Sequence, residues 1–125
     1  MIEPSSASPA RIVDGASHRK GLAPVYNEYS PVGGDPNYSA SQEDEHMLMR
    51  GLFMTSFLAE DLIADNDLFG AGAVLITSAS SKTSIALGFM VSKAGGAKAV
   101  GLTSERNVEF VKGLGCYDGV LPYDE

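Results

Sequence analysis

The sequence predicts an α/β fold in which helices cover a short parallel sheet. An apolar run of strand length, residues 73–77, precedes a segment of helical length whose apolar residues fall on one stripe, residues 81–93. Glycines then end the helix, and a second apolar run follows at residues 98–103. A strand, a helix and a strand in this order form a parallel βαβ unit. At 125 residues and 44% hydrophobic composition, the chain is long enough for one such core.

The first 40 residues predict an irregular leader. They are rich in Pro, Ser, Gly, Asn and Tyr and show no apolar period beyond a few residues. Residues 25–29 are expected to form a short extended segment. Three tyrosines, Tyr26, Tyr29 and Tyr38, exceed the aromatic content of a free linker, so we expect the leader to lie against another surface.

Residues 41–68 predict a helical connector. Ser41 supplies a capping hydroxyl, and acidic residues follow it in the first turn, where they suit the helix dipole. Apolar residues recur at helical spacing, and Gly51 predicts a break, so two short helices are expected rather than one long one. A stripe of Met and Phe side chains is expected to pack in the core. Its members are Met47, Met49, Phe53, Met54 and Phe57.

Residues 69–125 predict a partial dinucleotide-binding, Rossmann-like βαβαβ domain. After the strand at 98–103, a helix is expected over residues 105–112 and a third strand over residues 117–121. Three strands are about half of a complete dinucleotide-binding sheet. The first strand is therefore expected to have an exposed edge, which favours pairing with a protein partner or with a second copy of the chain.

The turn after the first strand is the first candidate binding site. A helix that begins there exposes unpaired N–H groups and the positive end of its dipole to an anion. Dinucleotide-binding turns carry three glycines, whereas this turn places Ser78, Ser81 and Ser84 at a three-residue rhythm. The candidate phosphate ligands are Ser80, Ser81, Lys82 and Thr83. The alternative is that Ser80 or Ser81 only caps the helix and Lys82 is solvated.

The end of the second strand is the second candidate binding site. An acidic residue at this place would accept a hydrogen bond from a ribose 2′-hydroxyl, whereas a basic residue accommodates a 2′-phosphate. The residues here are Thr103, Ser104, Arg106 and Asn107, which favours NADP over NAD as the cofactor. The candidate ligands among them are Thr103, Ser104 and Arg106. The alternative is that Ser104 caps the following helix and Arg106 pairs with Glu109 or with solvent.

A nucleoside-triphosphate loop is a rival interpretation of the same turn. Ser81, Lys82 and Thr83 resemble the Gly-Lys-Thr end of that motif. Its first glycine, however, would fall at Ile76 inside the strand, and no later apolar strand ends in an Asp for magnesium. The spacing therefore favours the dinucleotide interpretation.

The two histidines and the single cysteine are not expected to bind a metal or to act as nucleophiles. His18 and His46 have no second histidine at ligand spacing and are expected on the surface. Cys116 is the only cysteine, so it forms no internal disulfide, and it is expected to be a small buried residue rather than a nucleophile. A G-x-S-x-G nucleophile motif does not occur. We therefore expect no catalytic and no metal-binding residue.

The charge distribution excludes a nucleic-acid surface. The net charge of −7 arises in residues 1–71, where eleven acidic residues face four basic ones, whereas residues 72–125 balance five against five. The acidic half is expected to be a solvated face. No apolar run has secretory or membrane-spanning length, so we expect a soluble, cytoplasmic chain without a membrane partner.

Several short segments together resemble the medium-chain dehydrogenase/reductase superfamily, in particular a side family of its quinone-oxidoreductase-like branch. The resemblance is carried by Ser-Ala-Ser-Ser-Lys-Thr-Ser at 78–84, Gly-Ala-Lys-Ala-Val-Gly at 96–101, Thr103-Ser104, Leu114-Gly115 and Val-Leu-Pro-Tyr at 120–123. It covers residues 70–125 well and residues 45–65 more loosely.

The resemblance implies roles for the candidate residues. Ser80, Ser81, Lys82 and Thr83 would approach the pyrophosphate of NADP, and Ser104 and Arg106 the adenosine 2′-phosphate. Members of the superfamily also carry a barrel-like substrate domain and a six-stranded sheet, which do not fit into this chain. The resemblance thus implies an NADP-binding portion of an oxidoreductase that lacks turnover by itself. A non-catalytic interaction or scaffold piece, pairing through its sheet edge, is the alternative.

Overall fold

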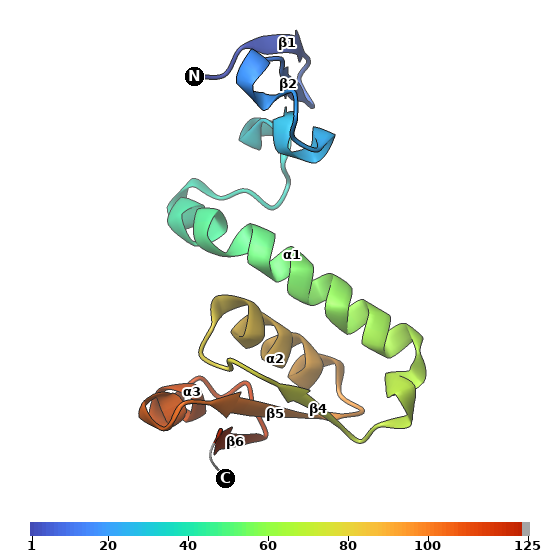
Figure 1. Ribbon diagram of the computed structural model, residues 1–125, viewed down its shortest axis with the longest axis vertical. Coiled ribbons are helices and arrows are strands. Elements are labelled where there is room, and N and C mark those ends of the chain that lie inside the picture. Colours follow the sequence, from blue (N-terminus) through green and yellow to red (C-terminus); the bar gives the residue numbers. More distant parts are fainter. Residues whose placement is uncertain (124–125) are drawn as a thin grey trace. The chain divides into compact units, whose positions relative to one another are not determined.

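The structure is a computed structural model that describes residues 1–123, and the chain divides into two compact units (Figure 1). The first unit is Met1–Glu43 and the second is Asp44–Glu125. Each unit has its own sheet, antiparallel in the first and parallel in the second. The α/β fold class predicted from the sequence is confirmed.

The first unit contains a small antiparallel sheet, where the sequence predicts only an irregular leader. Its strands are β1 (Pro4–Ala7), β2 (Ile12–Asp14) and β3 (Glu28–Tyr29), in that order across the sheet. Four 3₁₀ turns cover Ser17–Arg19, Pro24–Asn27, Val32–Gly34 and Ala40–Gln42. Strands of two to four residues are too short to show a period. The extended segment expected at residues 25–29 is reduced to Glu28–Tyr29, because Pro24 begins a 3₁₀ turn.

Asp14 is the polar centre of the first unit. Its carboxylate is almost fully buried, and Oδ1 accepts hydrogen bonds from the backbone N–H groups of Ala16 (2.9 Å) and Glu3 (3.1 Å). The Nε atom of Arg19 lies 3.4 Å from Oδ2. These two backbone hydrogen bonds, with the positive charge of Arg19 contributing less, hold the pKa of Asp14 below its ordinary value of 3.8. The ionised carboxylate therefore joins the residue before β1 to the turn that follows β2.

Acid is expected to weaken the β1–β2 sheet through Asp14. Because the pKa is lower in the folded unit, its stabilising contribution is complete above the unfolded value of 3.8 and disappears as the pH falls toward the folded value. In a two-dimensional NMR titration, the β1 and β2 amide signals should broaden below about pH 4. Asp14→Asn should weaken the sheet already at neutral pH and remove most of this pH dependence. The control is Glu28→Gln, which changes an exposed ion pair with Arg11 and should leave the pH dependence of the sheet unchanged. An acid transition in Asp14→Asn equal to that of the wild type would contradict the role of Asp14.

The second unit is built on a parallel sheet with strand order β4-β5-β6. In chain order its elements are α1 (Glu43–Asp65), a 3₁₀ turn (Asp67–Gly70), β4 (Ala73–Ile76), α2 (Lys82–Ala94), β5 (Lys98–Thr103), a 3₁₀ turn (Glu105–Asn107), α3 (Val108–Gly113) and β6 (Gly119–Pro122). The order β4-α2-β5-α3-β6, with all strand pairs parallel, is that of a partial Rossmann-like unit. β4 pairs with β5 and with no other strand in the described part of the chain.

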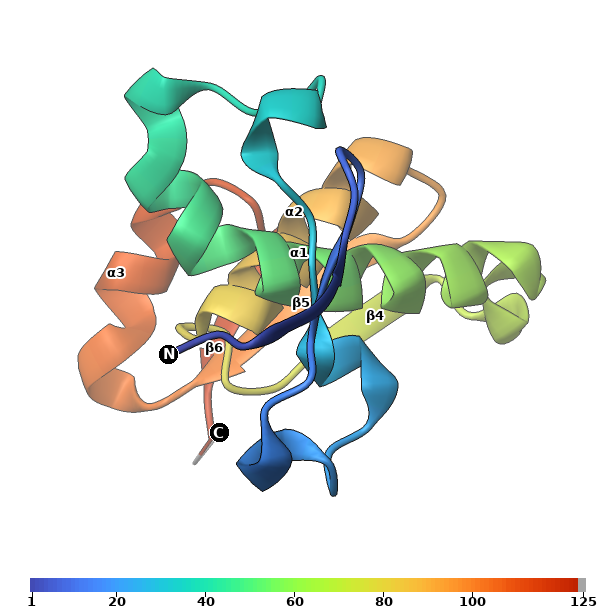
Figure 2. The same ribbon diagram turned by 90° about the horizontal axis from the view of Figure 1, so that it is seen from above.

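Helix α1 differs from the sequence prediction in two respects. It is one continuous helix of 23 residues, so the break expected at Gly51 is absent, because an exposed helical glycine costs only about 1 kcal/mol. The Met and Phe stripe is also not core: Met47 is 75% exposed and Met54 55%. The only fully buried residue of α1 is Ser56, whose hydroxyl donates to the carbonyl of Thr83 in α2 (2.8 Å). α1 lies against the outer side of α2, away from the sheet, as Figures 1 and 2 show, so only a narrow side of it is covered.

The core of the second unit lies between the sheet and α2. Its centre is the cluster of Ile76, Val91 and Ala99, each at most 4% exposed. Burial alternates along β5, so that its buried residues share the helix-covered face with Ile76. The strands thus place one apolar face against α2 and α3.

Tyr117 fills a slot between α2 and β5. A Cβ atom added to Gly88 would lie 2.7 Å from the Tyr117 ring, and one added to Gly101 would lie 3.1 Å from it. The Tyr117 hydroxyl lies within hydrogen-bond distance of two carbonyl oxygens, those of Ser84 (2.7 Å) and Ala79 (3.1 Å). Burial raises the pKa of the phenol, so the hydroxyl stays a donor. Tyr117 therefore joins the loop between α3 (Val108–Gly113) and β6 (Gly119–Pro122) to the turn at the start of α2.

Candidate functional site

The turn between β4 and α2 takes a glycine-like conformation without glycine. Ser78 has φ +50°, in the left-handed region, at the position where the fingerprint has its first glycine. The backbone N–H of Ala79 donates to the carbonyl of Leu102 in β5 (2.9 Å), and that of Ser81 donates to Ser78 (2.8 Å). These bonds hold the turn against the carboxyl end of the sheet.

The first turn of α2 has both bonded and open N–H groups. Ser81 is the N-cap, and its hydroxyl oxygen accepts from the N–H of Ser84 (3.2 Å). The Ser84 hydroxyl in turn donates to the carbonyl of Thr77 (2.8 Å). The alternative expectation that Ser81 caps the helix is thus confirmed. Within residues 1–123, the backbone N–H groups of Lys82 and Thr83 donate to no acceptor, and the Lys82 side chain is exposed. The helix end can therefore still accept an anion.

A second polar turn lies beside the first, at the end of β5. The amide nitrogen Nδ2 of Asn107 donates to the hydroxyl oxygens of Ser80 (3.2 Å) and Ser104 (3.1 Å), and its backbone N–H donates to the carbonyl of Ser104 (2.8 Å). Asn107 therefore ties the turn after β4 to the turn after β5. Both turns stand at the carboxyl ends of parallel strands, where open α/β sheets bind ligands.

The remaining predicted residues of the second turn have different environments. Thr103 is 1% exposed and faces the helix-covered side of the sheet, so its side chain is not at the surface of the turn. Arg106 is exposed in the 3₁₀ turn that follows Ser104. Glu109, the residue expected as an alternative partner of Arg106, pairs with Lys112 instead in the described part of the chain (3.2 Å). The structure thus brings Ser80 and Ser104 together and leaves Lys82 and Arg106 as exposed cations on the two turns.

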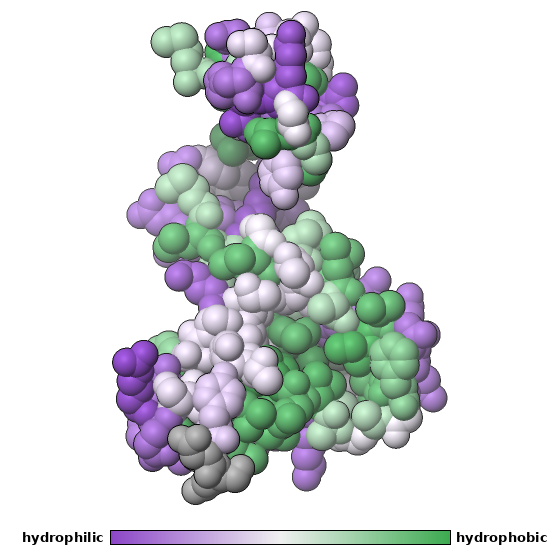
Figure 3. Space-filling model, in the orientation of Figure 1, coloured by the Kyte–Doolittle hydropathy of each residue, from purple (hydrophilic) through white to green (hydrophobic). Residues whose placement is uncertain are grey.

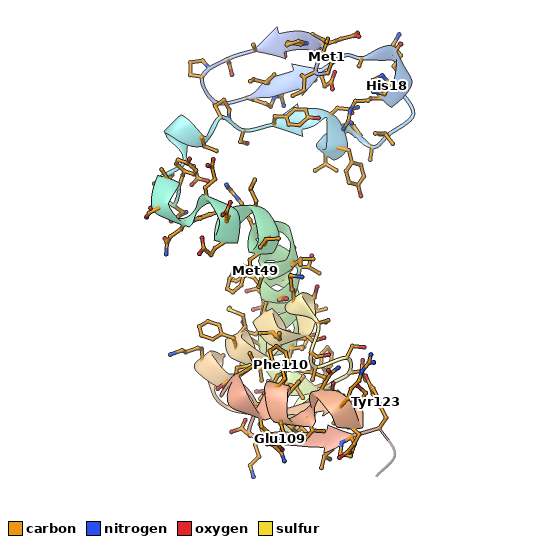
Figure 4. All side chains as sticks on the ribbon, turned by 90° about the vertical axis from the view of Figure 1, so that its left-hand side faces the viewer. Met1, His18, Met49, Glu109, Phe110 and Tyr123 are labelled. Carbon is orange, nitrogen blue, oxygen red and sulfur yellow. The ribbon has the colours of Figure 1, made fainter. Side chains whose placement is uncertain are left out.

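Tyr123 contacts the first turn from the end of β6. Its hydroxyl oxygen accepts from the backbone N–H of Ser78 (2.7 Å), and its own N–H donates to the carbonyl of Thr103 (3.0 Å). The side chain, labelled in Figure 4, is half exposed. Three residues that build the site are absent from the predicted set: Asn107, Tyr117 and Tyr123. Asn107 lies in the polar segment after the second predicted strand, Tyr117 begins the third predicted strand and Tyr123 follows it, and only these positions could have indicated them.

Cys116 and the histidines supply no reactive group to these turns. Cys116 is free, 8% exposed, and lines an apolar groove of about 300 Å³ between α1 and α2 together with Met49 and Phe53, among others. Burial raises the pKa of its thiol. His18 is exposed and His46 half-buried. Within the residues that the structure describes, no three side chains of His, Cys, Asp or Glu form a group that could hold a metal ion.

Cys116 is expected to react slowly with alkylating agents. Because the native thiol is buried and its pKa is raised, little thiolate is available to react. Iodoacetamide at pH 8 should modify the native chain more than about tenfold more slowly than the chain in concentrated guanidinium chloride. A short peptide with the same flanking residues gives the rate for the free thiol. Equal rates in the native chain and the peptide would show an accessible cysteine.

The fold and the two turns define an α/β protein whose second unit is a partial Rossmann-like βαβαβ unit. The chain belongs to the family described as "Protein of unknown function (DUF2855)", whose model matches residues 1–125. No curated protein and no solved structure matches the chain significantly. Among the described helices, none has the length and apolar character needed to span a bilayer.

Proposed function

We propose that the second unit binds the adenosine half of NADP and that the chain is the NADP-binding portion of a quinone-reductase-like, medium-chain oxidoreductase. The observation that carries the proposal is the contact of Asn107 with both Ser80 and Ser104. It fixes side by side the two turns that, in a dinucleotide-binding unit, contact the pyrophosphate and the adenosine ribose.

The turn after β4 is suited to the pyrophosphate. Among residues 1–123, no acceptor meets the N–H groups of Lys82 and Thr83 at the positive end of a 13-residue helix, and the Lys82 ammonium adds a full charge. The Ser80 hydroxyl accepts a hydrogen bond from Asn107 of the neighbouring turn, and its own hydrogen can still be donated to a phosphate oxygen. Ser81 contributes by capping, because its hydroxyl orients the first turn of α2.

The turn after β5 is suited to a 2′-phosphate. Ser104 and Arg106 provide a hydroxyl and an exposed guanidinium within three residues of each other. A guanidinium can donate two parallel hydrogen bonds to a phosphate. This combination supports NADP rather than NAD, which would require an acceptor for the ribose 2′-hydroxyl.

The described residues fit the adenosine end of the cofactor and assign no group to catalysis. When bound, NADP supplies hydride transfer at its nicotinamide. The chain's own residues would hold the phosphates and orient the adenosine, and we expect the chain by itself to lack turnover.

A non-catalytic interaction role is the second candidate function. It is favoured by the internal hydrogen bonds of the Ser81 and Ser84 hydroxyls, which are satisfied without a ligand. It is also favoured by exposed apolar side chains on α1 and β4. In this case the turn after β4 would only cap α2.

Calorimetric titrations of the chain with NADPH, NADH and ATP test the proposal. Binding of NADPH in preference to both other nucleotides is the expected result. ATP binding alone would instead favour a nucleoside-triphosphate loop. No heat with any nucleotide would overturn NADP binding in favour of the interaction role.

A further inference from the structure

One face of the parallel sheet has no cover within the described second unit. Register places Leu75 beside Val100 and Leu102 beside Leu121, so these four side chains share a face, which we call the open sheet face. Leu75 is 61% exposed and Leu121 44%, whereas Ile76 on the opposite face is 4% exposed. Parallel sheets are generally buried on both faces, usually by helices. The open sheet face therefore has the character of a surface that binds a helix.

Helix α1 has an apolar side that is also uncovered within the described second unit. Met47, Gly51, Met54, Leu58 and Leu62 follow one another at intervals of four, three, four and four residues, which places them on one stripe, the outer stripe. Its four side chains are between 55% and 75% exposed. The stripe lies opposite Ser56, the residue that contacts α2. Figure 3 shows hydrophobic surface over the sheet and over the carboxyl-terminal half of α1.

The two surfaces carry opposite charges at their edges. Side chains alternate between the two faces of a strand, so Lys98 lies on the same face of β5 as Val100 and Leu102, at the edge of the open sheet face. Asp61 and Asp65 flank Leu62 at the end of the outer stripe. Two α1 helices would instead repel each other, since α1 contains six acidic residues and one arginine. Charge thus favours a contact between stripe and sheet over a contact between two stripes.

We propose that the outer stripe of one copy of this chain binds the open sheet face of a second copy. The contact covers a parallel sheet with a helix, as such sheets require, and places Lys98 near Asp61 and Asp65. The stripe and the sheet face lie on opposite sides of α2 (Figures 1 and 2). In a closed dimer, each copy would have to bind the other through its stripe and its sheet face at the same time, which this arrangement prevents. The copies therefore associate head to tail into a chain of molecules.

Sedimentation velocity of the chain over a range of concentrations tests the proposal. The contact is small and belongs with weak interfaces of less than about 1,200 Å², so we expect a dissociation constant on the order of 100 μM. The average mass should rise above 13.1 kDa and pass twice that value without a plateau. A constant mass of 13.1 kDa at millimolar protein, or a plateau at the dimer, would overturn the proposal.

Two variants with complementary defects distinguish this contact from other forms of self-association. Leu58→Asp disables the outer stripe and Leu75→Asp disables the open sheet face, and both residues are exposed enough to leave folding intact. Each variant alone should be monomeric, while an equimolar mixture should form one complex of two chains, because one functional stripe and one functional face remain. If the mixture stays monomeric while the wild type associates, the assigned pairing is wrong.

Matched controls exclude a general effect of added charge. Leu48→Asp changes an exposed leucine of α1 outside the stripe, and Phe110→Asp changes an exposed residue of α3. Both should associate like the wild type. If either control variant failed to associate, the self-association would involve another surface, and the proposal would be overturned.

Discussion

Replacing Gly101 by alanine is expected to destabilise the second unit strongly, and replacing it by valine to unfold it. An added Cβ would lie 2.8 Å from the Cβ of Ala79 and 3.1 Å from the Tyr117 ring, both closer than normal contacts. The Ala79 Cβ cannot move without the backbone of the turn. Alanine should therefore cost about 3 kcal/mol, the upper end for overpacking. Valine adds two further methyl groups, against a total stability of only about 5–15 kcal/mol for a typical domain.

Thermal unfolding followed by circular dichroism measures this effect. The control is Gly51→Ala, where an added Cβ meets nothing within 4 Å. This change lies inside an exposed helix and should stabilise the chain by up to about 1 kcal/mol. The two glycine-to-alanine changes should therefore have opposite signs. A loss below about 1 kcal/mol for Gly101→Ala would mean that Tyr117 and the turn can move apart.

Removing either exposed cation of the two turns is expected to weaken NADPH binding by at least about tenfold, the loss of one hydrogen bond to a charged group. Lys82→Ala should reduce the affinity for NADPH and NADH alike, because the pyrophosphate is common to both. Arg106→Ala should reduce the affinity for NADPH only, since NADH has no 2′-phosphate. The second variant should thus abolish the preference between the two nucleotides.

Calorimetric dissociation constants for both nucleotides separate these two effects. Lys93→Ala is the matched control, because Lys93 lies in the last turn of α2, at the far end of the same helix. It should bind like the wild type. If Arg106→Ala lowered the affinity for NADPH and NADH equally, the turn after β5 would not bind the 2′-phosphate. Only the assignment of the pyrophosphate to the turn after β4 would then remain.

The order of strands and helices in the second unit follows from the sequence because it depends on local patterns. Hydrophobic period, the Ser81 cap and the glycines after α2 are short-range signals, and β5 was predicted to the residue. The exposure of α1 does not follow, since a helical period shows that apolar residues share a side and not what covers that side. The small sheet of the first unit escapes prediction because its strands are too short for a pattern.

The candidate site was only partly predictable for a related reason. Ser80, Ser81, Lys82 and Ser104 belong to recognisable turns, so the sequence identifies them. The contacts of Asn107, Tyr117 and Tyr123 with the first turn join residues 27 to 45 positions apart. Such contacts exist only once the sheet has formed, and no short motif records them.

The Tyr117 contact makes the turn after β4 dependent on the loop before β6, which comes much later in the chain. The carbonyls of Ala79 and Ser84 are held by a hydroxyl 38 and 33 residues away. Closing a loop of that length costs conformational entropy before the contact forms, so the turn cannot become ordered during local helix formation. The turn and the loop before β6 therefore gain order together, and an anion bound at the start of α2 would stabilise the Tyr117 contacts as well as the helix that it touches.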